Sequence, residues 1–171
     1  MSKTKPKIIV ISGTGPGAGK TTFANELCRV LPRAFPCSFA SPLKYICTKF
    51  FGWDGKKDEK GRTLLQEIGC AARHYDPNIW ANKALKVVAE ASVNPSYLVF
   101  DDARFPNEAD VFRAAGYEVI QFHISRYFDE PPHGIMHESE GYIPNPPFIL
   151  VESAEIEAFK ATARRLAKEL L

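Results

Sequence analysis

The segment from Gly13 to Thr22, with the sequence GTGPGAGKTT, combines the residue types that bind phosphate groups. Alternating glycines let backbone N–H groups converge on phosphate oxygens, and the start of a following helix adds the positive end of its dipole. Lys20 can bridge the β- and γ-oxygens of a nucleoside triphosphate, and the Thr21 hydroxyl can ligate Mg²⁺. We therefore predict binding of ATP or GTP with Mg²⁺ by Gly13, Gly15, Gly17, Ala18, Gly19, Lys20, Thr21 and Thr22.

The context of this loop is that of a Walker A motif, although the loop is one residue longer than the strict pattern. The β-branched run Ile8–Ser12 before it is typical of a parallel strand buried on both faces, and Thr21–Leu31 after it is predicted as a helix that ends at Pro32. The pattern G-x-x-x-x-G-K-[ST] would put its first glycine at Thr14. We expect the extra residue at the start of the loop, which leaves its phosphate-facing half in register.

Two carboxylates, Asp101 and Asp102, directly follow the apolar run Tyr97–Phe100, as in a Walker B element. Mg²⁺ prefers oxygen ligands and usually takes one carboxylate directly or through water, so Thr21, Asp101 and Asp102 are the predicted metal site. The sequence leaves open which of the two carboxylates serves the metal. In the other reading, both cap the following helix.

Arg104 comes in the turn after this predicted strand, at the sheet edge where ligands gather in open α/β folds. An arginine there can clamp a phosphate bidentately, and the competing interpretation is a structural ion pair. Next along the chain, Asn107 is predicted as the N-cap of a helix, with Glu108 in its first turn.

A polar stripe is predicted along the helix Arg62–Arg73, because Arg62, Gln66, Gly69 and Arg73 fall within about 60° of one another at helical spacing. Two guanidinium groups could grip an acidic acceptor, with Gln66 reading a base edge and Gly69 leaving room for the ligand. The alternative is a merely solvated helix face. Trp80, at the start of the next predicted helix, has two readings as well, a core residue or a base-stacking platform.

The elements that must position these residues alternate between strands and helices over one predicted domain, 1–171. Strands alternating with crossover helices predict a three-layer α/β fold with a mainly parallel five-stranded sheet. A helix with apolar positions from Ile156 to Leu170 closes the chain. Two segments, Gly52–Gly61 and Tyr127–Pro147, look irregular and are either lids or solvated loops. The predicted strands are Ile8–Ser12, Cys37–Ala40, Tyr97–Phe100, Tyr117–Ile124 and Phe148–Val151.

The composition argues against several classes of protein. With 22 basic and 20 acidic residues the net charge is +2, well short of the basic stripe of a duplex-binding protein, so nucleic acid is not an expected partner. The first hydrophobic run is too brief for a signal peptide or a membrane span, and a cytoplasmic protein with no membrane partner is expected. The cysteines show no C-x-x-C spacing and are predicted to be reduced and buried, and the pair His133 and His137 lacks a third metal ligand.

Several segments together resemble the bacteriophage-type deoxynucleoside monophosphate kinases, a branch of the P-loop nucleoside monophosphate kinases. The two more specific segments are Phe39-Ala40-Ser41-Pro42-Leu43-Lys44 and Asp102-Ala103-Arg104-Phe105-Pro106-Asn107-Glu108. Weaker ones are Arg62–Gly69 (RTLLQEIG), Asp76–Trp80 (DPNIW) and His137–Glu140 (HESE).

The resemblance implies transfer of the γ-phosphoryl group of ATP to a deoxynucleoside monophosphate, a sheet ordered 2-3-1-4-5, and a homodimer. It implies acceptor-binding helices over about 42–92 and a lid over about 126–147. Two alternatives stay open, a P-loop kinase that acts on a modified nucleotide or a base in DNA, and a nucleotide-binding switch or ATPase without an acceptor. The implied acceptor residues are Lys44, Arg62, Gln66, Arg73 and Arg104, with Trp80 kept in the set, and the implied catalytic residues are Lys20, Asp102, Arg104 and Arg126.

Overall fold

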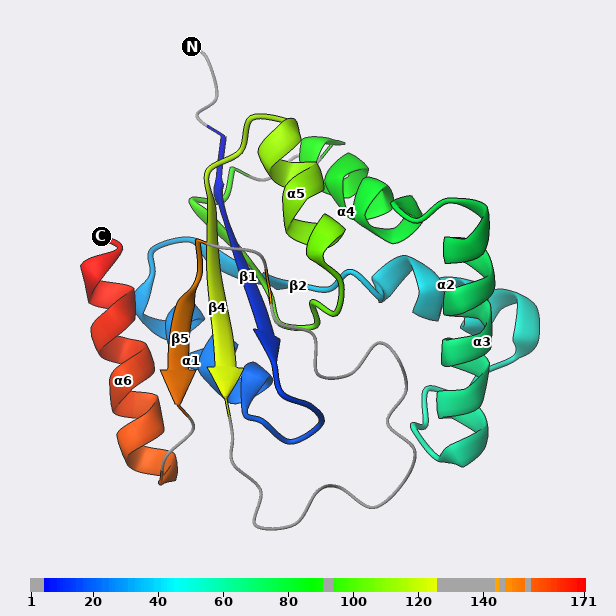
Figure 1. The fold of residues 1–171 in the computed structure, drawn as a ribbon, viewed down its shortest axis with the longest axis horizontal. Helices are drawn as coiled ribbons and strands as arrows, with labels where there is room; N and C mark the ends of the chain where they lie inside the picture. The colour runs from blue at the N-terminus through cyan, green and yellow to red at the C-terminus, as the bar shows by residue number, and fades with distance from the viewer. Residues whose placement is uncertain (1–4, 91–93, 126–143, 145–146, 153–154) are drawn as a thin grey trace.

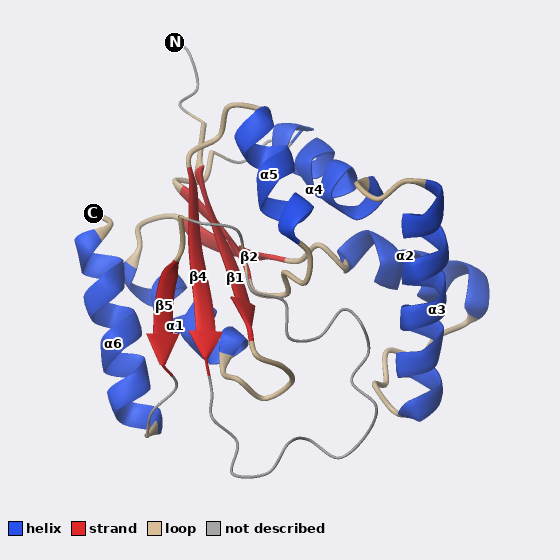
Figure 2. Cartoon of the chain, viewed as in Figure 1, coloured by secondary structure: helices blue, strands red, loops and turns tan. Residues whose placement is uncertain are grey.

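The computed structural model describes residues 5–90, 94–125, 144, 147–152 and 155–171, and its centre is a five-stranded sheet. The strand order is β2-β3-β1-β4-β5, and every neighbouring pair is parallel. Helices cover both faces of the sheet (Figures 1 and 2). The predicted α/β class and the strand order implied by the resemblance are both confirmed.

Strands and helices are interspersed along the described chain, with three helices in succession between the second and third strands. The strands are β1 (Lys7–Gly13), β2 (Ala34–Cys37), β3 (Tyr97–Phe100), β4 (Val119–Ser125) and β5 (Ile149–Glu152). The helices are α1 (Lys20–Val30), α2 (Ser41–Phe51), α3 (Glu59–Tyr75), α4 (Ile79–Glu90), α5 (Pro106–Ala114) and α6 (Ile156–Glu169).

Two cores lie on opposite faces of the sheet, because side chains along a strand alternate between faces. Ile9 and Ile11 of β1 pack with residues of α1 and α6, whereas Ile8 and Val10 pack with residues of α4 and α5. This double burial explains why β1 reads as an unbroken apolar run. A third, smaller cluster joins α2, α3 and α4 beside the sheet, on the right in Figure 1.

The second strand differs from its prediction. The sequence predicted Cys37–Ala40, but β2 ends at Cys37. β2 is an edge strand, which tolerates Pro36 because the missing N–H is not needed for a second partner strand. The three residues after Cys37 leave the sheet, and the backbone N–H groups of Phe39 and Ala40 bind the Asp102 carboxylate instead.

Two helix starts also differ from their predictions. The irregular segment Gly52–Gly61 ends earlier than expected, because Asp58 caps α3 by accepting a hydrogen bond from Gly61 N at 2.8 Å. α5 begins at Pro106, with Phe105 and not Asn107 as the N-cap residue. Proline is pre-organised for the first helical position, which moves the start of the helix forward. The helices predicted over Thr21–Leu31, over Arg62–Arg73 and at the chain end are confirmed.

Several predictions fall on residues outside the described part of the chain. These include Arg126, both histidines His133 and His137, and nearly all of the 126–147 lid segment. All four cysteines are described and free, but only Cys47 is fully buried. None of the helices in the described ranges combines the length and the apolar character needed to cross a membrane.

The two glycines inside α3 provide a test of how tightly this helix is packed. A Cβ at Gly61 would lie far inside contact distance of Lys56 O and 2.7 Å from Trp53 Nε1, whereas a Cβ at Gly69 would meet the flexible Leu43 Cδ2 at 3.2 Å. Alanine is favoured over glycine in a helix by about 1 kcal/mol. We expect Gly61→Ala to lower the free energy of unfolding by about 1–3 kcal/mol in urea denaturation. The matched variant Gly69→Ala should stay within about 1 kcal/mol of the wild type, and equal stabilities would contradict this packing.

Candidate active site

The glycine-rich loop between β1 and α1 has backbone conformations that favour glycine. Gly17 has φ 77° and Gly19 has φ 102°, both in the region that L-residues rarely adopt. A Cβ at Gly19 would lie 2.9 Å from Phe159 Cε1 of α6, whereas a Cβ at Gly17 would meet no atom within 4 Å. The loop is therefore packed on the α6 side and open at Gly17, as a loop that receives phosphate oxygens must be.

Lys20 and Thr21 begin α1 and point their polar groups to the loop and to β3. Lys20 Nζ donates a hydrogen bond to Gly15 O at 2.8 Å, and Thr21 Oγ1 donates one to Asp101 Oδ2 at 2.7 Å. A hydroxyl beside a carboxylate at the start of this helix is the oxygen donor set that Mg²⁺ prefers. The residues present therefore fit a nucleotide-bound magnesium ion, with Thr21 and Asp101 as the side chains that would hold it.

Asp102 faces a different neighbour. Its Oδ1 accepts from Phe39 N at 2.9 Å, and its Oδ2 accepts from Ser38 Oγ at 2.6 Å and from Ala40 N at 3.1 Å. The Phe39 ring is buried and stacks on Phe100, with 4.4 Å between the ring centroids. These contacts fix the β2–α2 loop to the end of β3. Of the two carboxylates that the sequence left open, the geometry favours Asp101 for the metal.

A cleft of about 470 Å³ joins the glycine-rich loop to α2 and α3. Its wall includes Lys20 and Thr21 on one side. It also includes every side chain that was predicted around the acceptor: Lys44, Arg62, Gln66, Arg73, Trp80 and Arg104. The structure thus brings the predicted donor and acceptor residues to one cavity.

Lys57 also lines this cleft, and sequence reasoning missed it. The signal was the lysine-rich segment Gly52–Gly61, which the sequence analysis treated only as a loop or lid. Arg62 Nε donates a hydrogen bond to Lys57 O at 2.9 Å, so the two cationic residues are held together at the start of α3.

Trp80 lies at the back of the cleft and belongs to the core. Its side chain is buried in the cluster with Leu43 and Cys47, and its Nε1 donates to Gly69 O at 3.2 Å. The space beside Gly69 is taken by Leu43 and Arg73, because a Cβ there would lie 3.2 Å from Leu43 Cδ2 and 3.6 Å from an Arg73 nitrogen. Gly69 therefore makes room for packing within the protein, whereas the sequence analysis expected it to make room for the ligand.

Arg73 is held between Phe105, the residue before α5, and Glu108 in the first turn of α5. Its guanidinium carbon lies 4.0 Å from the centre of the Phe105 ring, and one of its terminal nitrogens lies 3.5 Å from Glu108 Oε1. Burial raises the pKa of Glu108 to about 7 despite hydrogen bonds from the backbone N–H groups of Arg104 and Phe105. Burial also lowers the pKa of Arg73.

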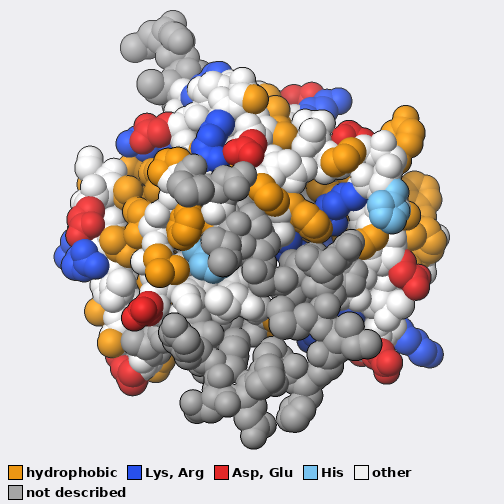
Figure 3. All heavy atoms as spheres, viewed as in Figure 1, with side chains coloured by type: hydrophobic (Ala, Val, Ile, Leu, Met, Phe, Trp, Pro, Cys, Tyr) orange, Lys and Arg blue, Asp and Glu red, His pale blue; other side chains and the backbone are white. Residues whose placement is uncertain are grey.

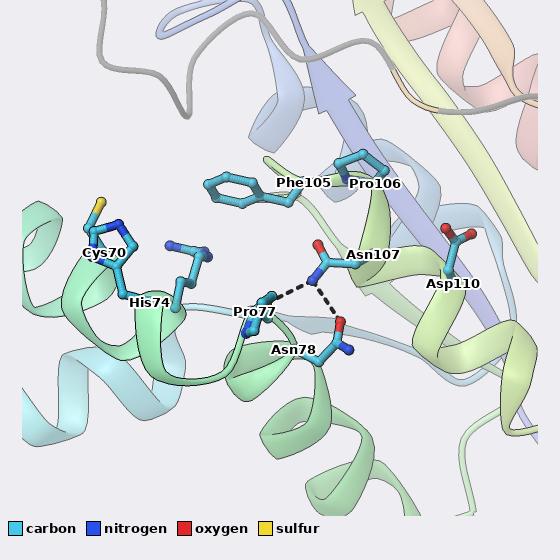
Figure 4. Close-up of a pocket in the computed structure, with 9 residues that line it drawn as sticks. Cys70, His74, Pro77, Asn78, Phe105, Pro106, Asn107 and Asp110 are labelled. Carbon is cyan, nitrogen blue, oxygen red and sulfur yellow. Dashed lines mark hydrogen bonds between the residues drawn. The ribbon is translucent and has the colours of Figure 1, made fainter.

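Arg73 and Cys70 are shared with a second cavity, of about 480 Å³, between α3 and the start of α5. Figure 4 shows Phe105 at one side of this cavity and the Asn107 amide at another. Asn107 Nδ2 donates to Pro77 O at 2.7 Å and to Asn78 Oδ1 at 2.8 Å. The start of α5 is thereby tied to the turn between α3 and α4.

A buried polar pair, Ser12 and His123, lies on the neighbouring strands β1 and β4. Ser12 Oγ is 2.9 Å from His123 Nδ1. Burial and the nearby Lys20 charge lower the pKa of His123, so its imidazole is neutral at neutral pH. Sequence reasoning missed both residues because they stand inside apolar strand patterns.

The described charges on the face drawn in Figure 3 are scattered, with basic and acidic side chains interspersed around the rim. Single-sign patches of the kind that track a nucleic-acid backbone are not seen among the described residues of this face. The cationic residues named above are concentrated inside the cleft instead.

Comparison with known proteins shows which solved structures have a similar fold. No protein-family model and no curated protein matches the chain. A solved structure of a candidate kinase from Chloroflexus aurantiacus is 16% identical, with 96% of this chain and 97% of that chain covered and a TM-score of 0.52. A gluconokinase from Sinorhizobium meliloti (16% identity, coverages of 97% and 96%) and a variant of the APS kinase from Mycobacterium tuberculosis (12% identity, coverages of 97% and 97%) both match with a TM-score of 0.47. With its glycine-rich loop and its 2-3-1-4-5 parallel sheet, this chain has the fold of the P-loop kinases.

Proposed function

We propose that this protein is a phosphotransferase that moves the γ-phosphoryl group of a magnesium-bound nucleoside triphosphate, ATP or GTP, to a deoxynucleoside monophosphate. The observation that carries the proposal is the single cleft lined both by Lys20 and Thr21 and by a set of cationic side chains from α2 and α3. A hydrolase or switch needs the first group of residues and has no use for the second. The nucleotide acceptor rests on the resemblance of the motifs in the acceptor wall.

The charge of the acceptor wall supports an acceptor that is itself anionic. The cleft is lined by Lys44 of α2, by Lys57 of the α2–α3 loop and Arg62 of α3, and by Arg104 of the β3–α5 connection. A phosphate monoester can accept hydrogen bonds from several cationic groups at once, which a neutral sugar hydroxyl cannot do. This favours a phosphorylated acceptor over a simple sugar.

In this proposal each side chain has a role in binding or orienting the two substrates. An oxygen of the acceptor phosphate attacks the γ-phosphorus, the bond from that phosphorus to the β–γ bridging oxygen breaks, and the nucleoside diphosphate leaves. Lys20 holds the donor phosphates, and Arg62 and Arg104 hold the acceptor phosphate in line. Thr21 and Asp101 would hold Mg²⁺, which neutralises charge on the transferred group.

The direct test is to incubate the protein with ATP and Mg²⁺ and with each of dAMP, dGMP, dCMP and dTMP separately, and to separate the products by chromatography. We expect a deoxynucleoside diphosphate with at least one of them, and none with the Lys20→Ala variant. Hydrolysis of ATP with every monophosphate left unchanged would overturn the proposal and favour the ATPase alternative. Adding oligodeoxynucleotides as acceptors separates the DNA alternative in the same assay.

Arg62 provides a prediction for the acceptor side of the cleft. A charge-assisted contact is worth about 1.5–3 kcal/mol, so Arg62→Ala should lower kcat/KM for the acceptor by about ten- to a hundredfold. The KM for ATP should change by less than about threefold, because Arg62 does not contact the donor loop. Lys60→Ala is the matched control, since Lys60 is an exposed cation of the same helix that does not line the cleft. Equal kinetics of the two variants would remove Arg62 from the site.

Asp101 and Asp102 give opposite predictions for metal dependence and stability. Asp101→Asn should raise the Mg²⁺ concentration needed for half-maximal transfer, with little change in urea denaturation, because its described partner is the Thr21 hydroxyl. Asp102→Asn replaces a carboxylate oxygen with an NH₂ group that cannot accept from the Ser38–Ala40 loop. It should lower the free energy of unfolding by about 1–3 kcal/mol. A metal titration shifted by Asp102→Asn alone would reverse the assignment.

A further inference from the structure

Glu108 is a buried carboxylate that lines the cleft and contacts two other residues of its wall, Arg73 and Arg104. It is 3% exposed, and it stands in the first turn of α5. Its Oε2 accepts from Arg104 N at 2.7 Å and from Phe105 N at 3.1 Å, which satisfies the backbone at the start of the helix. Its Oε1 faces Arg73, at 3.5 Å.

A neutral side chain could cap this helix at lower cost. Burying a carboxylate is unfavourable, and a buried ion pair is weak evidence for stability, because desolvation of the two charges offsets their attraction. The cost is visible in the pKa of Glu108, which burial raises to about 7. Glutamine would supply the same acceptor oxygen to the two N–H groups without this cost. The charge of Glu108 therefore calls for another explanation, and Arg73 is the charged side chain that it faces.

The neighbouring contacts restrict how Arg73 can move. Its guanidinium lies over the Phe105 ring at 4.0 Å, so it is held on one face by an aromatic ring and at its end by Glu108. Asn107, between these two residues in sequence, binds Pro77 O and Asn78 Oδ1 beyond the end of α3 (Figure 4). The α3 side of the cleft is thus held at a set distance from β3 by Phe105, just before α5, and by Asn107 and Glu108 in the first turn of α5.

We propose that Glu108 is a positioning residue for the acceptor site, which holds the Arg73 guanidinium at the cleft wall and fixes the backbone of the turn that carries Arg104. This inference rests on the proposed function. Glu108 also lines the cleft, but its described oxygen contacts are to protein groups, the Arg73 guanidinium and the backbone N–H groups of Arg104 and Phe105. It acts through Arg73. The Arg73 guanidinium keeps its orientation in the cleft wall only while one of its terminal nitrogens is held by the Glu108 carboxylate.

The direction of the pH effect differs between stability and acceptor binding. The pKa of Glu108 is raised from 4.5 to about 7, so folding favours its protonated form, and its contribution to stability is present below pH 4.5 and is lost as the pH rises through about 7. Positioning of Arg73 needs the ionised form, which dominates above about pH 7. The charged groups that bear on Glu108 are Arg73 from α3, Arg104 from the same connection and Asp102 at the end of β3.

The test compares the wild type with Glu108→Gln, which keeps an oxygen for the two N–H groups and removes the charge. The probe is whichever of dAMP, dGMP, dCMP and dTMP the wild type phosphorylates fastest. At about pH 8.5 we expect the KM for this acceptor to rise about tenfold, a change of about 1.4 kcal/mol, with the KM for ATP unchanged. The ratio of the two acceptor KM values should fall toward one as the pH is lowered below about 6. Titration of the acceptor phosphate cancels in this ratio, because it is the same for both proteins.

Three further measurements keep the inference falsifiable. Asp110→Asn is the control on the same helix, because it removes a surface charge that pairs only with Arg113 among the described residues. Arg73→Lys keeps the charge but loses the planar fork, and should reproduce the acceptor KM increase even if Glu108→Gln folds poorly. In urea denaturation, the wild type should lose stability relative to Glu108→Gln as the pH rises from 4.5 to about 7.

The outcomes separate this inference from the function on which it rests. If the wild type phosphorylates none of the four monophosphates, both the proposed function and the positioning role of Glu108 fail. If the wild type is active but the acceptor KM of Glu108→Gln equals that of the wild type at about pH 8.5, or if their ratio does not change with pH, only the positioning role fails.

Discussion

The hydrogen bonds that Asp102 accepts from the Ser38–Ala40 loop are the contacts on which the rest of the site depends. They join the end of β3 to the segment that leads into α2, and α2 in turn packs against α3 and α4. Because the donors are backbone N–H groups and a short hydroxyl, they leave little freedom in where α2 begins. The cationic wall of the cleft is therefore held at a defined distance from the glycine-rich loop, which lies at the end of the neighbouring strand β1.

The two acidic residues that follow β3 bind different parts of the protein. Asp101 is turned to Thr21 at the start of α1, and Asp102 is turned to the β2–α2 loop, so adjacent residues serve opposite sides of the cleft. The division arises where the chain leaves the sheet, since β3 ends at Phe100 and both carboxylates lie in the segment that follows. Beyond β3, Arg104 in the β3–α5 connection and the buried Glu108 in the first turn of α5 both line the cleft.

The fold itself does not identify the acceptor. P-loop kinases with the same sheet act on different substrates, and likeness to a candidate kinase at 16% identity concerns the arrangement of strands and helices alone. What narrows the acceptor is the chemistry of one wall, where lysine and arginine side chains from α2, α3 and the end of β3 meet. Under the proposed function, discrimination between nucleotide bases would depend on a few hydrogen bonds in this cleft, and Gln66 is one of the uncharged polar side chains that line it.

The sequence by itself determined the phosphate-binding loop, the order of strands and helices, and the polar face of α3, because each is a local pattern of spacing along one element. Only the tertiary structure decided that Asp101 and not Asp102 faces Thr21, that Trp80 is a core residue, and that β2 ends at Cys37. It also showed Glu108 bound to Arg73, from a helix far away in the chain. The physical reason is that these outcomes depend on which donor meets which acceptor across the fold, as in the bond from Phe39 N to Asp102, which spans 63 residues of sequence. A side chain's type limits the partners that it can take, but packing of distant elements selects the partner that it has.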